Sequence, residues 1–184
     1  MWPSELTTKA IAPRAAARAT MLGMATISLR PMTVDEFDAW QLALAEEYAA
    51  EKVAAGTWAL EGSVQRALDE SAALLPDGLD TERVLILRAV ADDGRPVGRA
   101  WVALDHPRGA PDTAFLYDIE VDESARGQGF GRALLAAVEE AVRATGAVAL
   151  ELNVFGRNEV AFGLYESAGY ATTSRQMRKE WPSA

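Results

Sequence analysis

The sequence contains no cysteine, a single histidine and no long apolar run among its 184 residues. Without cysteine the chain can form no disulfide bond, no thiolate metal site and no cysteine nucleophile. The lone histidine, His106, argues against a histidine-based metal cluster and against a Ser-His-Asp triad. No segment approaches the roughly 18 apolar residues that a membrane-spanning helix requires. We therefore expect a cytoplasmic protein that uses no metal and does not act in a membrane.

Basic residues are also scarce, because 18 lysines and arginines face 27 aspartates and glutamates, for a net charge of −9. A nucleic acid partner would require a basic surface, so we expect none. The acidic balance is compatible with a cationic substrate such as an amine, although an acidic surface also serves solubility alone. The hydrophobic fraction of 49% is ordinary for a globular chain that buries its own core.

The first 23 residues differ from the rest, because Lys9, Arg14 and Arg18 face one acid, Glu5. No apolar core of 7–15 residues lies between these charges, so the segment lacks the pattern of a secretory signal. We expect residues 1–23 to be a disordered extension and residues 24–184 to form a single domain.

Hydrophobic periodicity predicts an alternation of strands and helices along the remaining chain. A capping-box pattern, Thr33 with Glu36, begins the first helix. The predicted strands cover residues 26–30, 83–91, 97–104, 114–121, 147–155, 170–174 and 175–181. The predicted helices cover residues 34–50, 63–75, 131–145 and 158–168. Hairpins combined with two strand–helix–strand crossovers indicate an α/β fold whose central sheet mixes antiparallel and parallel strands.

Two further expectations concern the third quarter of the chain. Strict alternation in strand 114–121 places Phe115 and Tyr117 on one face and Asp118 and Glu120 on the other. His106 follows the preceding strand in a Pro- and Gly-containing loop, where we expect a solvated side chain.

The most distinctive stretch follows strand 114–121, where Gly127, Gly129 and Gly131 alternate just before an Ala/Leu-rich helix. Glycine lets the backbone turn sharply and approach a ligand, and the helix start offers unpaired N–H groups. Together these features form a phosphate-binding socket. Three common phosphate-binding loops do not match this stretch. A Walker A loop would end in Lys-Ser/Thr, a dinucleotide-binding loop has a different glycine spacing, and the glycine-rich loop of kinases lies in a β-hairpin.

The residues that remain, Arg126-x-x-Gly129-x-Gly131, resemble the pyrophosphate loop of the GCN5-related N-acetyltransferase (GNAT) family. Two downstream segments extend the resemblance: Leu152-Asn-Val-Phe, and Asn158-x-x-Ala161-x-x-Leu164-Tyr165-x-x-x-Gly169-Tyr170. The order of predicted elements also matches that family. The resemblance implies the GNAT fold, a mixed sheet in which a bulge splays the fourth and fifth strands apart.

The resemblance further implies transfer of an acetyl group from acetyl-CoA, a co-substrate, to a primary amine by direct attack. The loop and the end of the fourth strand would bind the cofactor, with the pantetheine arm beside Ile119 and Val121. The cofactor-binding residues carried over are Ile119, Val121, Arg126, Gly127, Gln128, Gly129, Phe130, Gly131, Arg132, Asn153 and Asn158. The acceptor is a small molecule or a protein N-terminus, and a homodimer is compatible with the family.

By the same resemblance Tyr165 would donate a hydrogen bond to the departing thiolate, seven residues after Asn158 and on the same helix face. An alkylammonium must lose a proton before it attacks, which requires a base. Glu120 is the first candidate and Asp118 the second, while Tyr117 could orient a water. The alternative from a different class is a non-catalytic CoA-binding regulatory module of the same fold.

Overall fold

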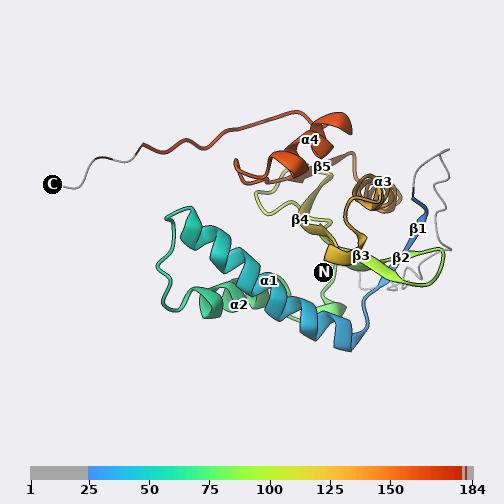
Figure 1. The fold of residues 1–184 in the computed structure, drawn as a ribbon, viewed down its shortest axis with the longest axis horizontal. Helices are drawn as coiled ribbons and strands as arrows, with labels where there is room; N and C mark the ends of the chain where they lie inside the picture. Colours follow the sequence, from blue (N-terminus) through green and yellow to red (C-terminus); the bar gives the residue numbers. More distant parts are fainter. Residues whose placement is uncertain (1–24, 180, 182–184) are drawn as a thin grey trace, which may run out of the picture. The chain divides into compact units, whose positions relative to one another are not determined.

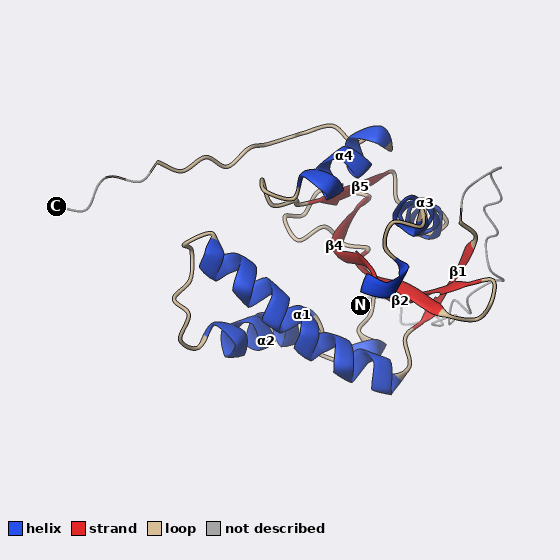
Figure 2. Cartoon of the chain, viewed as in Figure 1, coloured by secondary structure: helices blue, strands red, loops and turns tan. Residues whose placement is uncertain are grey.

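The computed structural model describes residues 25–179 and 181. The chain divides into two compact units, one ending at Leu152 and the other beginning at Asn153. Figure 1 follows the chain through its elements, and Figure 2 distinguishes the helices from the strands. The extension expected over residues 1–23 lies outside the described residues.

The first unit is built on a mixed sheet with strand order β1-β2-β3-β4-β5. The strands are β1 (Ile27–Pro31), β2 (Val84–Ala91), β3 (Pro96–Ala103), β4 (Thr113–Val121) and β5 (Ala149–Leu152). Neighbours from β1 to β4 pair antiparallel, whereas β4 and β5 pair parallel. The predicted mixed α/β sheet is therefore confirmed over these five strands.

Helices cover both faces of this sheet (Figure 1). They are α1 (Val34–Ala54), α2 (Ser63–Leu74) and α3 (Phe130–Arg143), and the second unit contains α4 (Glu159–Ser167). The predicted apolar stripe of α3 is buried: Leu134, Leu135, Val138 and Val142. No helix in residues 25–179 and 181 has the length and apolarity needed to cross a membrane.

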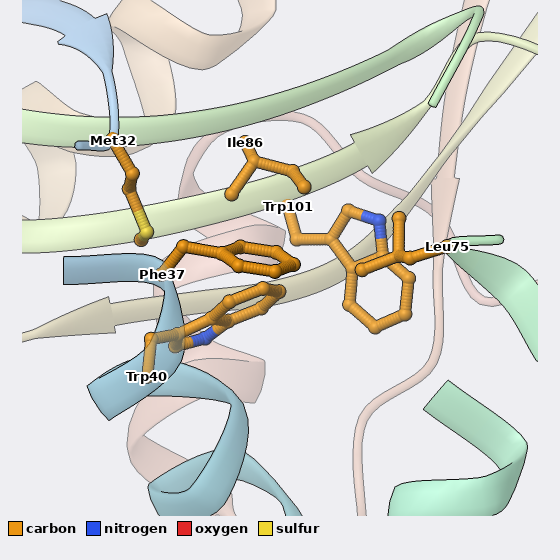
Figure 3. Packing of buried hydrophobic residues seen from close by; sticks show 6 residues of the cluster. All are labelled: Met32, Phe37, Trp40, Leu75, Ile86 and Trp101. Carbon is orange, nitrogen blue, oxygen red and sulfur yellow. The ribbon is translucent and has the colours of Figure 1, made fainter. Parts of the chain in front are cut away.

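A cluster of buried, mainly aromatic side chains packs α1 against the sheet, on the face opposite to α3 (Figure 3). Trp40 of α1 meets Trp101 of β3 edge to face, with ring centroids 5.6 Å apart. The buried members are Met32, Phe37, Trp40, Leu75, Ile86 and Trp101. Edge-to-face contact suits the ring quadrupoles and adds to the burial of large apolar surfaces. This packing fixes α1 against β3 and β4.

The capping box predicted for the start of α1 is present. Thr33 Oγ1 accepts a hydrogen bond from the Glu36 N–H, and the Glu36 carboxylate accepts one from the Thr33 N–H. Arg30 of β1 adds two hydrogen bonds to the same carboxylate, at 2.6 and 2.7 Å. These contacts, led by those from Arg30, lower the pKa of Glu36 from 4.5 to about 2. The helix start is thereby tied to the edge strand.

We expect Glu36→Gln to lower the free energy of unfolding by about 1 kcal/mol at neutral pH, the value typical of a well-formed partly exposed ion pair. Because the pKa of Glu36 is lowered on folding, its contribution is present above pH 4.5 and is lost as the pH falls toward 2. Denaturant titrations at pH 7 and pH 2.5 measure both effects. An equal difference between the two proteins at both pH values would contradict this assignment.

A β-bulge in β4 overturns the strict alternation predicted for that strand. Asp118 pairs with Trp101 and Leu116 with Val102, so Tyr117 is an extra residue opposite β3. In a bulge the two residues facing one partner project to the same side of the sheet. Tyr117 stacks on Trp101 with ring centroids 4.4 Å apart, and Asp118 shares that face. The acidic residues of β4 therefore lie on the α1 face together with Tyr117 and not opposite it.

Two features predicted for the fold, the last two strands and the splaying of β4 from β5, are absent from the described residues. Residues 170–179 and 181 form no strand, although strands were predicted over 170–174 and 175–181. The side chains of residues 171–179 are exposed, and a strand needs a ladder partner as well as a suitable local pattern. Splaying of β4 and β5 is not seen among the described residues, where Ala149–Leu152 pair in regular register with β4. β5 also ends at Leu152 and not at the predicted residue 155.

Candidate functional site

The glycine loop connects a single 3₁₀ turn (Glu123–Ala125) to α3. Gly127 and Gly129 have φ angles of +74° and +84°, a region that other residues rarely adopt. Gly129 is the N-cap of α3, and no side chain caps this helix start. A Cβ at either glycine would meet no atom within 4 Å. The loop thus presents uncapped helix N–H groups to open space, the arrangement that suits a phosphate.

The other predicted loop residues surround this helix start. Gln128 turns back and donates a hydrogen bond to the Ser124 carbonyl at 3.0 Å. Phe130 is buried beneath the first turn of α3, whereas Gly131 and Arg132 continue that turn. Phe130 therefore anchors the loop, and backbone N–H groups are what the loop offers a ligand.

The side chain of Arg126 points toward the end of β4. Its guanidinium lies 2.6 Å from Glu120 Oε1, and its Nε donates to the Val121 carbonyl at 3.2 Å. The Arg126 side chain is 57% exposed and that of Glu120 is 25% exposed. The structure thus brings a predicted cofactor residue into contact with the predicted base.

Arg99 of β3 gathers three carboxylates on the α1 face of the sheet. Its Nε donates to Asp118 Oδ2 at 2.9 Å, and its Nη2 lies 2.9 Å from Glu47 Oε2 and also contacts Glu120. Asp118 Oδ2 accepts a second hydrogen bond from Trp40 Nε1, at 3.0 Å. The Arg99 side chain is only 11% exposed. We call Arg99, Glu47, Asp118 and Glu120 the acidic cluster.

Charge repulsion and burial act on this cluster. Burial raises the pKa of Glu47, and repulsion from Glu120 and Asp118 adds to the effect while Arg99 opposes it. Burial alone would lower the pKa of Arg99, but attraction to Asp118, Glu120 and Glu47 raises it above its usual value. Burial also raises the pKa of the Tyr117 hydroxyl. The cluster holds three carboxylates around one buried cation.

The cluster is the end of a charged row that crosses the sheet. Arg30, Arg88, Arg99 and Glu120 are cross-strand partners in β1, β2, β3 and β4. Directly paired residues share a face, so this row lies on the α1 side. Arg88 binds the Asp122 carboxylate through two hydrogen bonds, at 2.6 and 3.2 Å. Asp122 immediately precedes the glycine-loop turn, so the row holds the start of the loop against β2.

The expectation of a solvated His106 is wrong, because its side chain is only 2% exposed. Its Nδ1 accepts a hydrogen bond from the Arg108 N–H at 3.1 Å, and its Nε2 lies 3.3 Å from a Glu151 carboxylate oxygen. The ring also meets Phe115 edge to face. Both ring nitrogens therefore face groups of the protein, which suits a structural role in the loop.

Three predicted site residues belong to the second compact unit. Asn153 follows β5 directly and is not part of a strand. Asn158 is the N-cap of α4, where its side-chain oxygen accepts a hydrogen bond from the Ala161 N–H at 3.1 Å. Tyr165 lies in the same helix, is 9% exposed, and has its ring centroid 5.7 Å from that of Tyr170. Seven residues and two helical turns separate Asn158 from Tyr165, as expected.

Sequence reasoning missed Arg99, Glu47 and Trp40. Arg99 carried one available signal, a charged residue inside an otherwise apolar strand, and such a residue is buried only when it is paired. Glu47 and Trp40 lie on α1, where their partners on β3 and β4 are distant in sequence. No local pattern indicated those contacts.

Comparison with known proteins relates this chain to acetyltransferases. The model of the acetyltransferase (GNAT) family matches residues 57–170. The uncharacterized N-acetyltransferases YycN and YdgE of Bacillus subtilis (strain 168) are 35% and 31% identical to this chain. The alignments cover 84% and 83% of this chain, and 99% and 97% of the relatives.

The crystal structure of YycN superposes with a TM-score of 0.80 at 34% identity, covering 86% of this chain and all of that one. A structure of the aminoglycoside N-acetyltransferase AAC(6')-Iy in complex with CoA shares the fold, with a TM-score of 0.55 at 19% identity over 94% of this chain and all of that one. With a matching family model over more than half its length and relatives along most of it, the chain belongs to the GNAT family and is a GNAT N-acetyltransferase.

Proposed function

We propose that this protein transfers the acetyl group of acetyl-CoA to a primary amine of a small molecule or a protein N-terminus. The observation that carries the proposal is the uncapped start of α3 behind Gly127 and Gly129, which offers N–H groups to a pyrophosphate. The family uses acetyl-CoA, and the open space above both glycines leaves room for a ligand. The residues present therefore fit the cofactor.

The pantetheine arm would run along the end of β4, beside Ile119 and Val121. The ladder between β4 and β5 stops at Leu116 and Leu152, so residues 117–121 have no β5 partner among the described residues. Backbone groups at a sheet edge can pair with the amides of an extended ligand. The bulge at Tyr117 lies beside this segment and offers a place for a backbone N–H to polarise the acetyl carbonyl.

In the proposed reaction the amine nitrogen attacks the thioester carbon directly. A carbon–nitrogen bond forms, the carbon–sulfur bond breaks, and CoA leaves as the thiolate while the amine proton passes to a base. Both candidates pair with the largely buried Arg99. Glu120 is favoured over Asp118 as this base, because its other oxygen pairs with the exposed Arg126, whereas Asp118 is also held by Trp40. The Glu120 side chain is also the more exposed of the two, at 25% against 13%.

Tyr165, Asn153 and Asn158 enter the proposal through the family motif. A phenol has a pKa near 10 and a thiol a pKa near 8.5, so full proton transfer from a tyrosine to the thiolate of CoA is unfavourable. Tyr165 would therefore stabilise the departing thiolate by donating a hydrogen bond to it. Asn158 retains its amide N–H groups for the CoA arm while its oxygen caps α4. Asn153, which follows β5, would contact the CoA arm, as the resemblance implies.

Ligand binding and turnover together test this function. We expect acetyl-CoA and CoA to raise the melting temperature of the protein, because a ligand that binds only the folded state stabilises it. A panel of amines, including diamines, aminoglycosides and short peptides with free N-termini, should then identify an acceptor through release of the CoA thiol. Binding of acetyl-CoA without amine-dependent thiol release across the whole panel would contradict the proposal.

A further inference from the structure

The contact between Arg126 and Glu120 connects two parts of the proposed site that have different tasks. Arg126 belongs to the glycine loop, and Glu120 belongs to the acidic cluster on the α1 face. Arg126 Nη2 lies 2.6 Å from Glu120 Oε1. The same guanidinium therefore has two anionic partners available in turn, a carboxylate and the pyrophosphate of acetyl-CoA.

The two arginines that hold Glu120 differ in their freedom to move. Arg99 is 11% exposed and also binds Asp118 and Glu47, so its position is fixed by three carboxylates. Arg126 is 57% exposed, and its further side-chain hydrogen bond goes to the Val121 carbonyl. An exposed ion pair of this kind is worth about 0.2–1 kcal/mol, so a multiply charged ligand can displace it. Only the loop arginine is suited to exchange.

Departure of Arg126 would change the charge of the acidic cluster. Glu47, Asp118 and Glu120 would then share the single cation of Arg99, leaving two negative charges uncompensated in place of one. Such a cluster attracts a cationic group more strongly, and it leaves Glu120 Oε1 without its partner in the loop. Binding of acetyl-CoA would thus prepare the acidic cluster to receive the amine.

We propose that Arg126 is a latch: it neutralises Glu120 in the free protein, and acetyl-CoA draws it onto the pyrophosphate and uncovers Glu120 for a cationic acceptor. This rests on the proposed function, because it assumes that the loop binds acetyl-CoA. Coupling of this kind is reciprocal, so a change that weakens the contact of Arg126 with Glu120 and keeps Arg126 itself should strengthen acetyl-CoA binding. The latch can therefore be tested without knowing the acceptor.

The test is a double-mutant cycle on acetyl-CoA affinity, measured by isothermal titration calorimetry on the full chain. Glu120→Gln should raise the affinity about 2- to 5-fold, the range of an exposed ion pair, because Arg126 no longer has a competing carboxylate. Arg126→Ala should weaken binding. In the Arg126→Ala background, Glu120→Gln should have no effect, since the latch is already absent.

Glu123→Gln is the matched control. It also removes one negative charge near the glycine loop, but in the described part of the chain Arg126 forms its ion pair with Glu120. It should leave acetyl-CoA affinity unchanged. An equal gain from Glu120→Gln and Glu123→Gln, or a gain from Glu120→Gln that persists without Arg126, would overturn the latch in favour of a general charge effect. Failure of the wild-type protein to bind acetyl-CoA would instead overturn the proposed function.

Discussion

Substitution of Gly129 by glutamate should abolish acetyl-CoA binding. Gly129 caps α3 in a left-handed conformation, and a side chain built there would project into open space in front of the helix start. That space is where the pyrophosphate is proposed to lie. Two like charges about 4 Å apart at an effective dielectric constant near 20 repel by about 4 kcal/mol. We therefore expect the affinity to fall by at least about 100-fold in calorimetric titrations.

Gly129→Gln separates charge from shape, because it imposes the same backbone strain and nearly the same volume without the carboxylate. Its loss of affinity should be much smaller, about 10-fold. Equal losses in both variants would mean that strain in the loop, and not repulsion, prevents binding. Unchanged affinity in Gly129→Glu would remove the assignment of this loop to the cofactor.

Replacement of Tyr165 by phenylalanine should reduce kcat by about 10- to 1000-fold, the range spanned by a hydrogen-bond donor and a full general acid. The phenylalanine ring keeps the apolar contacts of a side chain that is 9% exposed and packs near Tyr170. Only the hydroxyl proposed to stabilise the thiolate is lost. Acetyl-CoA affinity should change little, because that hydrogen bond gains strength as the carbon–sulfur bond breaks.

Tyr170→Phe is the control for Tyr165→Phe, since it deletes a hydroxyl from the neighbouring ring in the same unit. Thiol release by Tyr170→Phe should match the wild type, and the melting temperatures of both variants show whether they fold. Equal turnover by Tyr165→Phe and the wild-type protein would return Tyr165 to a packing role.

Features determined by a few consecutive residues could be predicted from the sequence. The capping box of Thr33 and Glu36 closes within four residues, and its side chains meet as the pattern indicates. The glycine loop before α3 is equally local, because the need for positive φ at Gly127 and Gly129 is met only by glycine at low cost. The buried stripe of α3 follows from helical periodicity alone.

Features that depend on pairing between distant strands could not be predicted. The bulge at Tyr117 leaves no mark in the sequence of β4, yet it moves Asp118 and Glu120 to the face of Tyr117. Their contacts with Arg99 and Trp40 then cross 19 to 78 residues of chain. The charged groups around the proposed base could therefore not be inferred without the register of β3 and β4.

Near the end of the chain the sequence predicted pairing that the structure lacks. Residues 170–174 and 175–181 have patterns that suit strands, but a local pattern cannot supply the neighbouring strand that a ladder requires. The structure has no strand in residues 170–179 or at 181. His106 shows the same limit, because its contacts with Phe115 of β4 and Glu151 of β5 are not indicated by its own loop sequence.

A crystal structure of the protein with bound CoA tests the central claim most directly. We predict the pyrophosphate on the N–H groups of residues 128–131, the pantetheine arm along Ile119 and Val121, and the Arg126 guanidinium on the pyrophosphate and no longer on Glu120. CoA bound away from the glycine loop, with Arg126 still paired to Glu120, would contradict the account.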